Sequence, residues 1–151
     1  MNSLPTEIEI AKTCLHYLLL EEFNDGPAPN QESLEDSISK HNFALYASRY
    51  WGSHVKSANA ERDLVIEKLL HRLSLSLSRI DAISELSWVD TASDWTNYAW
   101  DRGKSLFHLY AENGLTVLAK DLLDRQKVFS PYSIKLIVNR RLRVIRIWHS
   151  S

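Results

Sequence analysis

The stretch that decides the fold is GKSLFHLYAENGLTVLAKDLLDR, residues 103–125. Its pattern predicts two short helices joined by a tight turn at Gly114, because glycine adopts the left-handed conformation that ends a helix without a steric penalty. Ala111 supplies a small side chain where the helices approach closely. The second helix gains a buried side from three leucines, Leu118, Leu122 and Leu123. We therefore expect a helix-turn-helix hairpin.

This hairpin resembles an ankyrin repeat, whose pattern is G-x-TPLHxAAxxG, then a short turn and a helix that ends in Leu-Leu. In this resemblance Ser105 stands at the position of the capping threonine and His108 at that of the repeat's histidine. Leu106 replaces the usual proline, Tyr110 replaces the first alanine, and Gln126 stands where glycine commonly follows. The alternative is an unrelated helical hairpin.

Three upstream segments look like the helical region that follows the NACHT module in fungal NLR-like ankyrin proteins. They read CLHYLL at 14–19, EFNDGP at 22–27 and YASRYWGSH at 46–54. In that family an NTPase module precedes a winged-helix and helical connector, which an ankyrin array follows. No G-x-x-x-x-G-K-[ST] loop occurs in this sequence, so nucleotide binding is not carried over. The chain therefore looks like a truncated relative that lacks the NTPase module and further repeats.

The N-terminal region, residues 1–78, shows four helical patterns. Thr6 followed by Glu9 forms a capping box that predicts a helix start, and Asn30 caps a short helix through Ile38. The third pattern places mostly aromatic residues on one helix face, namely Phe43, Tyr46, Ala47, Tyr50, Trp51 and His54. The fourth opens at Asn59 and Glu61 and keeps one apolar series in register, namely Ile66, Leu69, Leu70, Leu73 and Leu77.

The remaining regions differ in character. Residues 79–102 lack sustained periodicity, and their tryptophans Trp88, Trp95 and Trp100 predict a pinned linker. After the single repeat at 103–126, Ser130 and Pro131 start a basic amphipathic helix within 127–151. We expect an all-α fold, in which an irregular helical bundle precedes one ankyrin-like hairpin and a C-terminal helix.

A single repeat cannot bury its own apolar face, because ankyrin arrays need about three or more units. We therefore expect the upstream helices to cover one side of the hairpin. The helix predicted at 131–148 would cover the other side through its apolar stripe, which comprises Ile134, Ile137, Val138, Leu142, Ile145 and Trp148.

Composition places the chain among globular proteins, with 44% hydrophobic residues and a formal net charge of -1. Residues 1–39 carry eight acids against the one base Lys12, whereas seven bases and no acid follow from Arg125 onward. This uneven charge distribution has three interpretations. The basic C-terminal end could attract an anionic partner, the two ends could attract each other, or the charges could simply be solvated surface. The lone Cys14, the lack of an apolar run of roughly 18 residues and the lack of a leader predict a cytoplasmic or nuclear protein.

No pattern for catalysis, a metal or a cofactor is present. The six histidines contain no H-x-x-x-H pair, and no G-x-S-x-G motif occurs. Cys14 has apolar neighbours, which disfavour a reactive thiolate. We therefore expect neither an enzyme nor a cofactor.

The expected function is a protein–protein interaction scaffold or regulatory fragment, with NLR-like relatives among its possible partners. Ankyrin surfaces bind through their turns and first helices, so the candidate contacts are Arg102, Lys104, Leu109, Tyr110 and Glu112. The alternative is a small helical domain that binds nucleic acid or an acidic membrane surface. Its candidate contacts are the tail residues Arg140, Arg141, Arg143 and Arg146.

Overall fold

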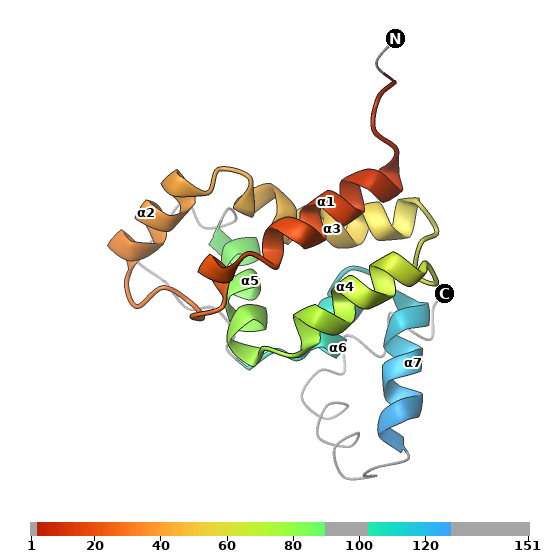
Figure 1. Cartoon of the computed structure of the whole chain (residues 1–151). Coiled ribbons are helices and arrows are strands. Elements are labelled where there is room, and N and C mark those ends of the chain that lie inside the picture. Colours follow the sequence, from red (N-terminus) through yellow and green to blue (C-terminus); the bar gives the residue numbers. More distant parts are fainter. Residues whose placement is uncertain (1–2, 90–102, 128–151) are drawn as a thin grey trace.

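All regular secondary structure is helical in residues 3–89 and 103–127, which are the residues that the computed structural model describes. In chain order the elements are α1 Glu7–Leu18, the 3-10 turn η1 Glu21–Phe23, α2 Gln31–Lys40, α3 Ala44–Ser57, α4 Leu64–Ser74, α5 Leu77–Val89, α6 Leu106–Glu112 and α7 Thr116–Lys127 (Figure 1). The predicted all-α class is confirmed. Within the described ranges, no helix combines the length and the apolar composition of a membrane span.

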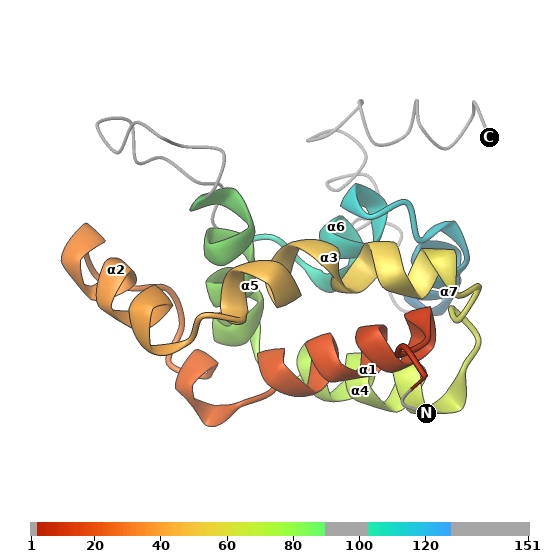
Figure 2. The same cartoon turned by 90° about the horizontal axis from the view of Figure 1, so that it is seen from above.

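Helix α3 lies at the centre of the arrangement. It runs alongside α1, and α6 lies on its other side in Figure 2. Helix α4 packs against α1, and α5 packs against α3. The main apolar cluster joins α1, α3, α4, α5 and the hairpin, and its most enclosed members include Leu15, Trp51, Ile66, Leu70 and Leu115. The hairpin is thus part of the principal core.

Local capping explains several helix starts. Glu9 Oε2 accepts from the Thr6 N–H at 2.7 Å, and Thr6 Oγ1 accepts from the Glu9 N–H at 3.4 Å, so the predicted capping box is confirmed. Asn30 Oδ1 accepts from the Ser33 N–H at 2.8 Å and caps α2, as predicted. Helix α2 continues two residues beyond the predicted Ile38, to Lys40.

The predicted start of the fourth helix is wrong. Asn59 takes a left-handed φ of 51° after α3, so it cannot begin a helix. The cap is Asp63, whose Oδ1 accepts from the Val65 and Ile66 N–H groups, both at 3.0 Å. Helix α4 then ends at Ser74, and Leu77 opens the next helix with 70% of its surface exposed. The predicted apolar series therefore spans two helices.

The predicted aromatic face on α3 is present, because the Tyr46 ring centroid lies 5.3 Å from that of Phe43, 4.9 Å from that of Tyr50 and 5.8 Å from that of His54. The buried residues of α3 are mostly small: Ala44, Ala47, Ser48, Trp51, Gly52 and Val55. Tyr46 and Tyr50 keep 39% and 44% of their surface exposed. The reason is that α3 lies between α1 and the hairpin, and small side chains allow both neighbours to come close. The tyrosines stay at the edge of the contact.

The predicted linker at 79–102 is wrong for its first part, because α5 occupies 77–89. Ile80, Ile83 and Leu86 are buried, and so are the polar residues Arg79 and Glu85. Arg79 Nη1 donates to the Leu18 and Leu20 carbonyl oxygens, both at 2.8 Å. A helix enclosed on several sides has no single apolar face, so its sequence lacks a clear period. Trp95 and Trp100 lie outside the described residues.

Candidate interaction groove

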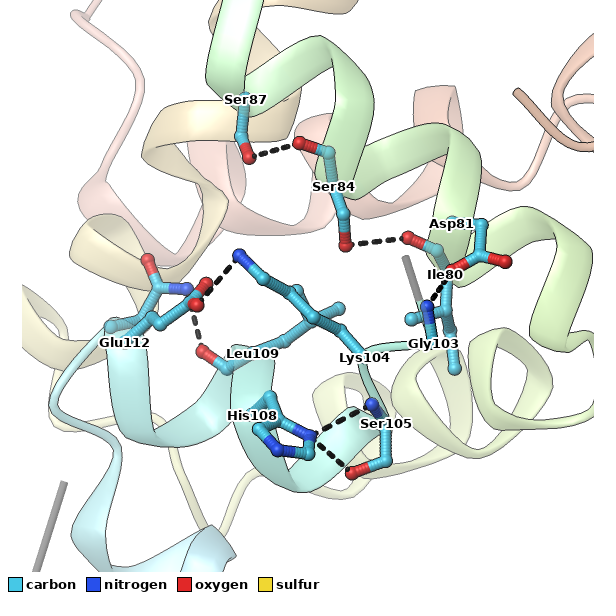
Figure 3. A network of polar contacts seen from close by, with 11 residues as sticks. Ile80, Asp81, Ser84, Ser87, Gly103, Lys104, Ser105, His108, Leu109 and Glu112 are labelled. Atoms are coloured by element: carbon cyan, nitrogen blue, oxygen red, sulfur yellow. Dashed lines mark hydrogen bonds and ion pairs between the residues drawn. The ribbon is translucent and has the colours of Figure 1, made fainter. Parts of the chain in front are cut away.

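The predicted helix-turn-helix hairpin is present. Ser105 precedes α6, and its N–H donates to His108 Nδ1 at 2.9 Å, while its hydroxyl lies 2.8 Å from the same nitrogen (Figure 3). Gly114 has the left-handed φ of 69° that the turn was expected to require. Glu61 Oε2 accepts from the Leu118 N–H at 3.0 Å, which places a carboxylate at the start of α7.

The turn of the hairpin rests directly on α3. A Cβ atom placed on Gly52 would lie 2.3 Å from Asn113 Cγ and 2.5 Å from Asn113 Cβ. A Cβ atom on Gly114 would lie 2.8 Å from Lys56 Nζ. The absence of a side chain at Gly52 therefore allows α3 and the turn to approach closely.

The hairpin buries its apolar residues in the main core. The members from α6, the turn and α7 are Leu106, Phe107, Leu109, Tyr110, Leu115, Leu118 and Ala119. They form one cluster with residues of α1, α3, α4 and α5, so the expected cover by upstream helices is observed. The helix predicted at 131–148, which was expected to cover the other side, lies outside the described residues.

The five predicted contact residues have three different outcomes. Lys104 Nζ and Glu112 Oε1 form an ion pair at 2.7 Å (Figure 3). Leu109 and Tyr110 are only 3% and 4% exposed, so their expected role as surface contacts is wrong. Both side chains pack in the core that the hairpin shares with the bundle. Arg102 lies outside the described residues, as do the tail candidates Arg140, Arg141, Arg143 and Arg146.

Burial also sets the chemistry of Tyr110. Its hydroxyl loses hydration on burial, which raises its pKa well above the ordinary value, whereas Arg125 opposes the shift and Glu67 adds to it. Glu67 of α4, Tyr110 of α6 and Arg125 of α7 all border one space between α4 and the hairpin.

That space is a groove of about 880 Å³ between α4 and the hairpin. Its apolar lining consists of Leu64, Leu70, Leu106, Tyr110, Leu118 and Leu122. Its charged lining consists of Glu61, Arg62, Glu67, Lys68, Arg72, Asp121 and Arg125, and His71 and Ser74 complete it. No local sequence pattern reveals the groove, because its walls come from two separate parts of the chain, residues 61–74 and 106–125.

The charges of the groove are unevenly paired. Glu61 already accepts from the α7 backbone, and Glu67 lies 3.8 Å from Arg125 in an exposed ion pair. Within the described residues, the side chains of Arg62, Lys68 and Arg72 make no hydrogen bond or ion pair. Three solvated cations thus line a groove whose remaining charges are Glu61, Glu67, Asp121 and Arg125.

Other side-chain clusters offer less for chemistry. The Cys14 side chain on α1 is fully buried. Burial raises the pKa of its thiol to about 11, which disfavours the thiolate. The His54 ring links α1 to α3. Its Nδ1 lies 2.6 Å from Glu7 Oε2, and its Nε2 lies 2.7 Å from the Tyr46 hydroxyl oxygen. Among residues 3–89 and 103–127, no cluster of three metal-ligating side chains is found.

The chain matches no protein-family model, no curated protein and no solved structure. The resemblances to ankyrin repeats and to NLR-like proteins therefore rest on the sequence motifs alone.

Proposed function

We propose that this chain is a non-enzymatic module that binds other proteins through its helical surface. The observation that supports the proposal is the groove between α4 and the α6–α7 hairpin, with its apolar lining and charged rim. Grooves between helices recognise amphipathic peptide helices in this way, because apolar anchors supply affinity and rim charges select the partner.

The size of the groove is compatible with this role. Its volume of about 880 Å³ falls within the roughly 300–1,000 Å³ of sites that enclose small molecules or the anchor side chains of a larger ligand. The exposure of Leu64 at 71% gives a partner an apolar contact on the α4 wall.

The same proposal extends to the class of partner. The segments 14–19, 22–27 and 46–54 resemble the helical region of fungal NLR-like ankyrin proteins. Such proteins are therefore the first partners to test, in the cytoplasm or the nucleus. The hairpin would then act as an ankyrin-like repeat that contributes one wall of the groove.

Point substitutions test the proposal better than a deletion. Removing residues 103–126 would take Leu115 and Ala119 out of the core, where both are fully buried, and the chain would unfold. Leu64→Asp places a charge in the groove instead. Its matched control is Leu75→Asp, because Leu75 is 72% exposed and does not line the groove.

The measurement is affinity capture by the full-length chain, followed by identification of the bound proteins. The expected result is that Leu64→Asp loses partners that wild type and Leu75→Asp both retain, with unchanged circular dichroism. Equal capture by all three forms would show that the groove is not the binding surface.

A further inference from the structure

We infer that the groove between α4 and the hairpin binds an acidic amphipathic helix, an inference that rests on the proposed protein-binding function. The first step concerns its cations. The side chains of Arg62, Lys68 and Arg72 line the groove without a hydrogen bond or ion pair to the described residues. Carboxylates of a partner would pair with them and steer its approach.

The spacing of the α4 wall matches a second helix. Leu64, Lys68 and Arg72 follow one another at intervals of four residues, so they lie along one face of α4 about 6 Å apart. A partner helix that carries an apolar residue and two carboxylates at the same interval would meet all three positions. The repulsion between like charges on Lys68 and Arg72 would be relieved at the same time.

The opposite wall supplies the second apolar contact. Leu122 of α7 is half-buried and lines the groove across from α4. With Leu64 it forms a pair of apolar contacts on the two walls. A peptide with one apolar face and one acidic face fits both the leucines and the cations.

The chain's own basic segment fits the groove less well. Residues 131–151 contain five bases and no acid, and these would face Arg62, Lys68 and Arg72. Nucleic acid is also disfavoured, since a phosphate chain cannot avoid the carboxylates of Asp121 and Glu67 in the same lining. A helical peptide can direct its carboxylates toward Arg62, Lys68 and Arg72 and leave Asp121 and Glu67 in contact with water, whereas a phosphate chain carries a charge at every nucleotide.

The test uses the full-length chain and two labelled peptides in fluorescence anisotropy. Both peptides place leucines along one helix face, and the other face carries glutamates in one and lysines in the other. Micromolar binding of the glutamate peptide alone is expected. The double variant Lys68→Glu, Arg72→Glu should weaken that binding by about tenfold or more and should favour the lysine peptide.

The control variant is Lys40→Glu, because Lys40 is an exposed cation on α2 outside the groove. It should leave both affinities unchanged, and circular dichroism should confirm that every variant is folded. Equal binding of the two peptides, or no binding of the glutamate peptide, would overturn the inference. Displacement of the glutamate peptide by a short heparin fragment at low concentration would assign the groove to polyanions and would also overturn it.

The outcomes separate this inference from the proposed function. If Leu64→Asp loses captured partners while the glutamate peptide fails to bind, the chain binds proteins of another chemistry. If the glutamate peptide fails to bind and Leu64→Asp captures the same proteins as wild type, the groove neither binds proteins nor prefers acidic peptides.

Discussion

Replacement of Gly52 by alanine tests how the hairpin is held against α3. The new Cβ atom would lie 2.3 Å from Asn113 Cγ and 2.5 Å from Asn113 Cβ, whereas carbon atoms prefer separations of roughly 3.5–4.0 Å. Rotation of the Asn113 side chain cannot relieve the contact, because its Cβ atom is itself too close. The hairpin turn would have to move away from α3.

The expected free-energy change has two opposing parts. Alanine improves the helix propensity of α3 by about 1 kcal/mol over glycine. Overpacking of a close contact costs about 1–3 kcal/mol. Movement of Asn113 would also strain its hydrogen bond from Nδ2 to the Leu109 carbonyl oxygen, now 2.8 Å long, which contributes about 0.5–1.5 kcal/mol. Gly52→Ala should therefore destabilise the protein by about 0.5–3.5 kcal/mol.

The assay is urea unfolding followed by circular dichroism. Ser53→Ala is the matched control, since Ser53 is exposed on the same helix and its replacement should change stability by less than about 0.5 kcal/mol. The double variant Gly52→Ala, Asn113→Gly removes the clashing side chain and should recover part of the loss. A Gly52→Ala protein as stable as wild type would refute the close approach of α3 and the hairpin turn.

Three further predictions concern buried groups. Arg79→Met removes the two hydrogen bonds to the Leu18 and Leu20 carbonyl oxygens and should lower the free energy of unfolding by about 2–4 kcal/mol. The control is Arg72→Met at an exposed position. An equal loss of stability in the two variants would contradict the role of these hydrogen bonds. Because burial raises the Cys14 pKa to about 11, the thiol should resist alkylation at pH 8 until urea unfolds the chain, and rapid native labelling would argue against its enclosure. Because the pKa of Tyr110 is raised on folding, its contribution to stability should be complete below the unfolded pKa of about 10 and should decline at higher pH. The free energy of unfolding in urea should therefore fall less between pH 9 and pH 11 for Tyr110→Phe than for wild type. An equal fall in both proteins would contradict the burial of the hydroxyl.

Short-range signals predicted two helix starts and the hairpin turn correctly. The Thr6–Glu9 capping box, the Asn30 cap and the left-handed Gly114 are all present, because each depends on atoms within four residues of one another. The hairpin at 103–126 was predicted for the same reason. Its ankyrin identity stays a prediction, since no comparison tests it.

The start of α4 was missed because Asp63, not Asn59, is its cap. The other errors arose where neighbours from distant parts of the chain determine burial. Helix α5 was taken for a linker because it is enclosed on several sides and shows no single apolar face. Leu109 and Tyr110 were expected at the surface, yet the bundle buries them.

By itself, the amino-acid sequence determined the helical class, the caps and the hairpin turn, since backbone hydrogen bonding and glycine conformation are local properties. Only the tertiary structure decided which helix faces are buried and where the groove lies. The groove exists because α4 and α7 lie side by side without closing the space between them. That space depends on the packing of whole helices, which no local pattern records.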